Sequence, residues 1–165
     1  MTIAVCPGSF DPVTLGHLDV VRRARAMFDE VVVGVARNSS KAALLPAARR
    51  VELARTALAG LDGVRVELVE GLLTDFCLDV GAVAVVKGLR GGADFDHELP
   101  MALMNRHIAG VETVFVVGDP ALGHIASSLV KDVARFGGSI EDLVPDGVEA
   151  VLRDALGTVP AHEKE

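Results

Sequence analysis

The stretch "CPGSFDPVTLGH" (residues 6–17) places a histidine at the start of the first predicted helix. A buried strand is predicted to end at Cys6, and a loop rich in Pro, Gly and Asp separates it from Gly16 and His17. The first turn of a helix offers unpaired N–H groups and the positive end of a dipole, which together bind anions. The stretch therefore predicts a phosphate site with His17 at its centre. It has neither GxxxxGK[ST] nor GxGxxG, so this site is of another kind.

Three further loops carry residues suited to the same chemistry. Lys87 and Arg90 stand beside glycines in "KGLRGGADFDHE" (87–98), where we expect the backbone to approach an anion closely while the side chains reach it. Ser127 and Ser128 begin a later predicted helix, and Lys41 lies in the loop 37–46. Each signal is weak alone, and a shared location would make them specific.

The elements that must position these loops alternate between strand and helix. Strands are predicted at 3–6, 30–36, 64–69, 82–86 and 113–117, and helices at 17–28, 46–61, 72–81, 94–110, 127–138 and 147–157. Pro100 is expected to start or kink the helix over 94–110. This alternation predicts an α/β fold: one Rossmann-like domain over 1–157, a five-stranded parallel sheet in the order 3-2-1-4-5, and helices on both faces. Residues 158–165 are predicted to form a disordered tail. Ligands of such sheets bind beyond the carboxyl ends of the strands, where loops 7–17 and 87–98 meet.

Composition limits the possible partners. The 165 residues are half hydrophobic and carry a net charge of −7, which favours a globular protein and argues against a general nucleic-acid binder. No apolar run is long enough to span a bilayer, and the first residues do not resemble a secretory signal. Cys6 and Cys77 have no metal-binding spacing and are interpreted as reduced core thiols. These features predict a cytoplasmic protein.

The residues also carry a family resemblance. "GSFDPVTLGH" resembles the T/HxGH signature of the nucleotidyltransferase superfamily, with Thr14, Gly16 and His17 in its fixed places. "KGLRGGADFDHELPMALMNRH" (87–107) and "SSLVKDVA" (127–134) are similar to segments of the bacterial phosphopantetheine adenylyltransferases. The resemblance covers the chain from the first strand to about residue 156. It implies that ATP and 4′-phosphopantetheine give dephospho-coenzyme A and pyrophosphate by in-line attack of the acceptor phosphate on the ATP α-phosphate.

The resemblance also implies site residues. Catalysis would depend on His17, Lys41 and Arg90. Contacts to ATP would come from Ser9, Phe10, His17, Gly88, Leu89, Arg90, Glu98, Leu122, Gly123, His124, Ile125, Ala126, Ser127 and Ser128. The acceptor would be bound by Ser9, Lys41, Leu73 and Lys87. The implied cofactor is Mg²⁺, held mainly by ATP phosphates and not by protein ligands, and the implied assembly is a homohexamer.

The chain departs from its relatives at three places. Lys87 stands where many relatives have Arg, which keeps the charge but loses the bidentate geometry. The segment 122–126 lacks the aromatic residue that many relatives place near the adenine, and His124 or backbone contacts are possible substitutes. Ala126 replaces the first serine of the usual triple.

Other interpretations stay open at this stage. The acceptor could be another phosphate, such as nicotinamide mononucleotide or glycerol phosphate, or the protein could be a nucleotide-binding regulator without catalysis. Ser127 and Ser128 could serve only as N-caps, and Asp11 could only fix its loop through an Asx turn. Glu98 and Asn105 could belong to the exposed polar face of a helix.

Overall fold

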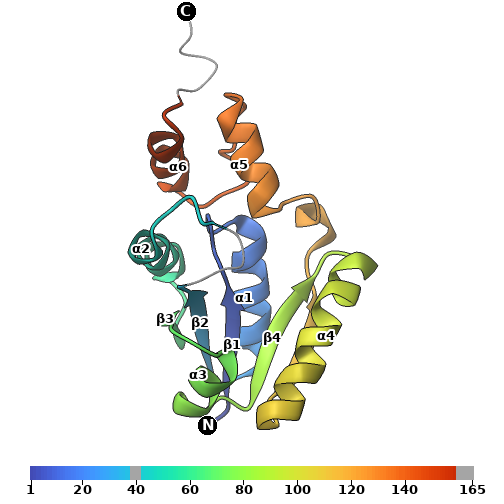
Figure 1. Cartoon of the computed structure of the whole chain (residues 1–165). Helices are drawn as coiled ribbons and strands as arrows, with labels where there is room; N and C mark the ends of the chain where they lie inside the picture. The colour runs from blue at the N-terminus through green and yellow to red at the C-terminus, as the bar shows by residue number, and fades with distance from the viewer. Residues whose placement is uncertain (38–41, 159–165) are drawn as a thin grey trace, which may run out of the picture.

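Five parallel strands form the centre of the computed structural model, which describes residues 1–37 and 42–158 (Figure 1). The strands are β1 (Ile3–Gly8), β2 (Glu30–Ala36), β3 (Val64–Val69), β4 (Ala84–Leu89) and β5 (Glu112–Val117). Their order across the sheet is β3-β2-β1-β4-β5, which confirms the predicted topology of one α/β domain. The chain reverses direction across the sheet between β1 and β4, so the crevice between their carboxyl ends is the expected ligand site.

Helices cover both faces of this sheet. They are α1 (Leu15–Met27), α2 (Ala47–Leu58), α3 (Leu73–Asp79), α4 (Gly92–Ala109), α5 (Ser127–Arg135) and α6 (Val148–Leu156), with a short 3₁₀ turn η1 (Pro120–Leu122). Alternate residues of each strand are buried on opposite faces: Val31 and Val33 join one hydrophobic cluster, and Val32 joins the other. Burial on both faces explains the continuous β-branched runs of the inner strands.

The observed ends of several helices and strands differ from the predicted ones. β4 runs through Lys87 and Gly88 to Leu89, so these residues end a strand and do not open a loop. Their strand character comes from pairing, because Lys87, Gly88 and Leu89 lie opposite Phe115, Val116 and Val117 of β5. The helix α4 continues through Pro100 as a single element, so the expectation that Pro100 starts it was wrong. Residues 159–165, the main part of the predicted tail, lie outside the described residues.

Gly88 is explained by packing more than by approach to an anion. A Cβ atom at this position would lie 2.3 Å from Cγ2 of Val20 on α1, a distance that real carbon atoms do not adopt. The glycine therefore allows α1 to lie close against β4. This close contact places the first turn of α1 beside the carboxyl end of β4.

Candidate active site

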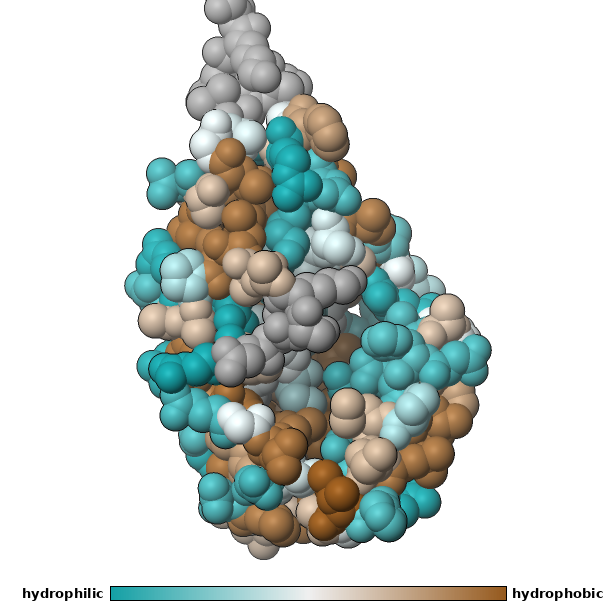
Figure 2. Space-filling model, viewed as in Figure 1, coloured by the Kyte–Doolittle hydropathy of each residue, from teal (hydrophilic) through white to brown (hydrophobic). Residues whose placement is uncertain are grey.

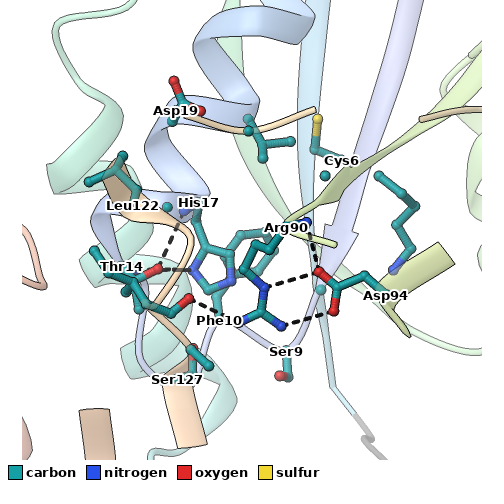
Figure 3. Close-up of a pocket in the computed structure, with 18 of the residues that line it drawn as sticks. Cys6, Ser9, Phe10, Thr14, His17, Asp19, Arg90, Asp94, Leu122 and Ser127 are labelled. Atoms are coloured by element: carbon teal, nitrogen blue, oxygen red, sulfur yellow. Dashed lines mark hydrogen bonds and ion pairs between the residues drawn. The ribbon is translucent and has the colours of Figure 1, made fainter. Parts of the chain in front are cut away.

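A cavity of about 540 Å³ opens at the carboxyl edge of the sheet, between β1 and β4 (Figure 3). It brings together residues from loops that are far apart in the sequence. Of the residues predicted to bind ATP, those that line it are Ser9, Phe10, His17, Gly88, Leu89, Arg90, Glu98, Leu122, Ile125, Ala126, Ser127 and Ser128. Gly123 and His124 are not among the lining residues. His124 is exposed, and its suggested contact with the adenine stays a prediction.

A second cavity of about 520 Å³ adjoins the first. The two share a wall formed by Pro7, Gly8, Ser9, Lys87, His97 and Glu98. Leu73, predicted to contact the acceptor, lines only the second cavity, with the side chains of Val69 and Met101. The site therefore has two compartments, and Lys87 stands at the boundary between them.

His17 is the third residue of α1, and a capping box fixes its orientation. The backbone N–H of Thr14 donates to Nδ1 of His17 at 3.0 Å, and the backbone N–H of His17 donates to the Thr14 hydroxyl at 3.3 Å. An amide N–H can only donate, so Nδ1 must be unprotonated. The neutral ring therefore carries its proton on Nε2, which is left to donate to a ligand.

The surroundings of His17 favour the neutral ring. Burial, followed by the positive charges of Arg90 and Lys87, lowers the pKa of His17 from 6.5 to about 4. Its ring also packs against the buried ring of Phe10, with centroids 4.8 Å apart. At neutral pH the side chain is thus a fixed hydrogen-bond donor without a charge of its own.

Arg90 projects beside His17 and is held in place by two partners (Figure 3). Its Nε and Nη2 donate to the carboxylate of Asp94 at 3.1 Å each, and its Nη1 donates to the carbonyl of Ile125 at 3.0 Å. The guanidinium has five N–H donors, so these three bonds leave two for a ligand. The sequence analysis assigned no role to Asp94, which positions Arg90; because of that contact the pKa of Asp94 is lowered.

Lys87 and Glu98 form an ion pair across the wall between the two cavities. The distance from Nζ to Oε2 is 3.1 Å, and both side chains are about three-quarters buried. Glu98 therefore does not belong to a solvated helix face. It pairs with Lys87 and also lines the first cavity, where the nucleotide is predicted to bind.

The start of α5 lacks the serine caps that the sequence left open as an alternative to phosphate binding. The N-cap is Ala126, and neither Ser127 nor Ser128 makes a capping hydrogen bond, so this interpretation was wrong. The hydroxyl of Ser127 instead donates to the carbonyl of Pro12 at 2.8 Å. The first N–H groups of the helix face the cavity region without an intrahelical partner, as at any helix start.

Asp11 fixes its loop through distant partners and not through an Asx turn. Its carboxylate accepts the backbone N–H groups of Leu44 and Leu45, both at 2.9 Å, and the Lys131 ammonium at 2.9 Å. These partners lower the pKa of Asp11 although its burial raises it. Lys41 lies outside the described residues, while its neighbours Ala42 and Ala43 line the first cavity.

The second cavity contains polar groups that the sequence did not reveal. Asn105 is only 5% exposed and lines this cavity, so it does not belong to an exposed polar face. The buried hydroxyl of Thr113, on the same wall, has no hydrogen-bond partner among the described residues. An apolar cavity with a few such polar groups suits a ligand that has both apolar and hydrogen-bonding parts.

Both cysteines are buried free thiols, and burial makes them poor nucleophiles. Burial raises the pKa of the Cys6 thiol to about 12 against a smaller lowering by Lys87, and Cys77 is also raised by burial, to about 11. Within residues 1–37 and 42–158, no cluster of three or more His, Cys, Asp or Glu side chains is arranged to hold a metal ion. No helix in this part of the chain is long and apolar enough to cross a membrane.

Comparisons with known proteins define the class first. A model of the cytidylyltransferase-like family matches residues 5–133. A candidate nicotinate-nucleotide adenylyltransferase from Vibrio parahaemolyticus has a similar structure, with a TM-score of 0.66 at 19% identity over 92% of this chain and 99% of that one. A lipopolysaccharide core biosynthesis protein from Thermoplasma volcanium has a TM-score of 0.54 at 23% identity, covering 72% and 97%. These two structures support the fold alone.

Relatives of higher identity narrow the class. The phosphopantetheine adenylyltransferase of Bifidobacterium longum (strain DJO10A) is 54% identical over 158 residues, which is 94% of this chain and 95% of that protein. The phosphopantetheine adenylyltransferase of Nocardioides sp. (strain ATCC BAA-499 / JS614) is 54% identical over 94% of this chain and 98% of its own. The chain belongs to the cytidylyltransferase-like family and, within it, to the phosphopantetheine adenylyltransferases.

Proposed function

We propose that this protein joins ATP and 4′-phosphopantetheine to give dephospho-coenzyme A and pyrophosphate. The observation that carries the proposal is the pair of adjoining cavities with Lys87 and Glu98 in their shared wall. The first cavity has His17, Arg90 and the start of α5, which suit a triphosphate. The second is a largely apolar compartment beside Leu73 and Asn105, which suits the pantetheine arm. The names of the relatives agree with this pair of substrates.

The reaction needs no nucleophile from the protein. An oxygen of the acceptor phosphate attacks the α-phosphorus of ATP, the bond to the bridging oxygen between the α- and β-phosphates breaks, and pyrophosphate leaves. Catalysis then consists of positioning and of stabilising the charge that develops on the α-phosphate oxygens. The Nε2–H of His17 is the fixed donor for those oxygens, because Thr14 occupies Nδ1.

The cationic side chains have separate roles in this proposal. Lys87, at the boundary of the cavities, holds the acceptor phosphate in line with the α-phosphorus, and Ser9 lies on the same wall. Arg90 contacts the ATP phosphates through its two remaining N–H donors. Ser128 and the N–H groups at the start of α5 hold the β- and γ-phosphates. Lys41 is proposed, on the family resemblance alone, to neutralise charge near the attacking phosphate.

Mg²⁺ would enter on the phosphates of ATP and neutralise part of their charge. The carboxylates that line the first cavity are already engaged by cations or N–H groups: Asp94 by Arg90, Glu98 by Lys87, Asp11 by Lys131, Asp19 by Arg23, and Asp119 by the N–H of Ala121. These residues therefore do not fit a metal cage made by the protein, and the steps above depend only on side chains and substrates.

The proposal extends to compartment and assembly. We place the protein in the cytoplasm, since both cysteines are free thiols. We also propose a homohexamer, as the family resemblance implies. Hydrophobic residues reach the surface in several places (Figure 2). On α4 the large exposed ones are Phe95, Met101, Leu103, Met104 and Ile108, which supports an assembly surface on this helix. Light scattering of the purified protein tests this part.

Phosphorus NMR tests the reaction directly. ATP, Mg²⁺ and the protein are incubated with 4′-phosphopantetheine, nicotinamide mononucleotide or glycerol 3-phosphate in parallel. We expect dephospho-coenzyme A and pyrophosphate only in the first mixture. Turnover of nicotinamide mononucleotide or glycerol 3-phosphate alone would establish the alternative acceptor, and ATP binding without pyrophosphate release in any mixture would contradict catalysis.

A further inference from the structure

Arg50 on α2 is a buried arginine beneath the first cavity. Arg50 is only 1% exposed, and its guanidinium donates four hydrogen bonds to backbone carbonyls. Nη1 donates to Ser9 at 2.6 Å and to Ala36 at 2.8 Å. Nε donates to Leu45 at 3.0 Å, and Nη2 donates to Arg37 at 3.3 Å. One side chain thus connects the loop after β1 with the end of β2 and the segment before α2.

The buried positive charge of Arg50 has no carboxylate partner among the described residues. Within residues 1–37 and 42–158, no carboxylate lies within ion-pair distance of its guanidinium, which only carbonyl dipoles solvate. The second buried arginine, Arg153 on α6, differs because it pairs with Glu149 at 2.6 Å while it donates to Ala134 and Gly138. Burying a positive charge without a carboxylate is costly to the fold. A site that binds a polyanion gives that charge a partner.

The bond from Arg50 to Ser9 sets the direction of the next N–H group. A trans peptide is planar, so the carbonyl of Ser9 and the N–H of Phe10 point in opposite directions. Because Arg50 holds the carbonyl of Ser9, the N–H of Phe10 points away from the Arg50 guanidinium, and both Ser9 and Phe10 line the first cavity. This N–H has no hydrogen-bond partner among the described residues.

The backbone at Phe10 shows that this orientation is enforced. Phe10 has a φ of 47°, in the left-handed region that a bulky residue seldom adopts. Such a conformation persists only where surrounding contacts fix it. Arg50 holds the peptide before Phe10, and Asp11 after it is anchored by Leu44, Leu45 and Lys131.

We infer that Arg50 is a positioning residue for binding of the ATP phosphates. Arg50 directs the N–H of Phe10 toward a phosphate oxygen and adds a positive charge on the opposite side of the Ser9–Phe10 peptide. This inference rests on the proposed function, since it assigns a second role around the same nucleotide. Arg50 touches no substrate and acts through the Ser9–Phe10 peptide. Its loss should therefore weaken phosphate binding selectively and leave the contacts to adenosine intact.

Titration calorimetry of Arg50→Lys and Arg50→Gln with ATP and with adenosine tests this. Lysine keeps a charge but cannot hold four carbonyls, and glutamine loses the charge as well. We expect ATP affinity to fall at least tenfold in Arg50→Lys and further in Arg50→Gln, while adenosine affinity stays within twofold. In steady-state assays the KM for ATP should rise more than the KM for 4′-phosphopantetheine.

Arg153→Lys is the matched control, because it alters a buried arginine that lines neither cavity. It should lower the melting temperature and leave the ratio of ATP to adenosine affinity unchanged. If the Arg50 variants lose ATP and adenosine affinity equally, or lose neither, the inference is overturned and Arg50 has a structural role only. A wild-type protein that binds ATP no better than adenosine would instead contradict the proposed function.

NMR of the wild-type protein keeps the inference testable if both Arg50 variants fail to fold. With ¹⁵N-phenylalanine labelling, the Phe10 amide should shift strongly with ATP and with pyrophosphate, and little with adenosine. A Phe10 amide that does not respond to pyrophosphate would show that this N–H does not face a phosphate.

Discussion

The geometry and the lowered pKa of His17 suit a hydrogen-bond donor and not a base. A ring with a pKa of about 4 and its Nδ1 occupied by the Thr14 amide cannot take a proton near neutral pH. The chemistry agrees with this state, because the attacking phosphate is already ionised and needs no deprotonation. A neutral donor also avoids fixing a third positive charge beside Arg90 and Lys87 before the substrates bind.

Replacement of His17 should therefore affect turnover more than binding. In His17→Ala we expect kcat to fall roughly a hundredfold or more, as loss of one oxyanion-type donor does, while the Kd for ATP changes little. His17→Gln, which can place an N–H near the same point, should retain more activity. Stopped-flow and equilibrium titration give the two quantities, and near-normal turnover of His17→Ala would remove the assigned role.

Lys87 should distinguish the two substrates. Because it stands in the wall between the cavities, Lys87→Ala should raise the KM for 4′-phosphopantetheine far more than the KM for ATP. Lys87→Arg keeps the charge and should remain active. Steady-state kinetics with each substrate varied provide the comparison, and an equal rise in both constants would place Lys87 elsewhere.

At the scale of elements, two contacts bring helix ends to the edge of the sheet. Ser127 ties the start of α5 to the loop after β1, and Gly88 lets α1 lie against β4. Each contact places a helix N-terminus beside the cavity, where its free N–H groups favour an anion.

The start of α5 gives a test with two nucleotides. The Ser128 hydroxyl makes no cap, so its removal should cost little stability. A hydrogen bond to a charged phosphate is worth about 1.5–3 kcal/mol, so Ser128→Ala should weaken ATP binding roughly ten- to a hundredfold. AMP, which lacks the β- and γ-phosphates, should bind nearly as before. Unchanged ATP affinity would mean that these phosphates lie elsewhere, and Ala126→Ser serves as a nearby control with little expected effect.

The contact between Gly88 and Val20 gives a second test. Gly88→Ala should destabilise the protein by about 1–3 kcal/mol through overpacking. The double variant with Val20→Ala makes room for the new methyl group and should recover part of that loss. Urea denaturation of both single variants and the double variant measures the coupling, and additive effects would show that the helix and strand are not in contact here.

At the scale of the molecule, His17 links stability to pH. In the unfolded chain its pKa returns to about 6.5, whereas the folded value is about 4, so between these values the unfolded state binds more protons. Stability from His17 is therefore complete above pH 6.5 and is lost as the pH falls toward 4. His17→Gln should reduce the slope of unfolding free energy against pH in this window by up to about 1.4 kcal/mol per pH unit. Urea melts from pH 4.5 to 7 measure it, and parallel slopes would contradict the low pKa.

The sheet could be predicted because short apolar segments rich in β-branched residues alternate with segments whose apolar residues recur at helical spacing. The sequence analysis placed the end of β4 too early, since "KGL" has no strand propensity and is extended only through pairing with β5. It could not separate Arg49 from Arg50, which are neighbours of the same type, one exposed and one buried. The sequence likewise did not show that Asp94 lines the first cavity or that Asn105 and Thr113 line the second, because the packing of helices against the sheet decides which residues a cavity exposes.

The bond between residue 14 and His17 has a consequence for the signature itself. The donor that fixes the imidazole is a main-chain amide, which every residue type except proline possesses. Substitution at position 14 can weaken the start of the helix, yet it cannot erase the group that selects the ring's reactive nitrogen. A residue other than Thr at position 14 would therefore still leave Nε2 of His17 as the protonated nitrogen. This agrees with the T/HxGH signature, in which the first residue is either Thr or His.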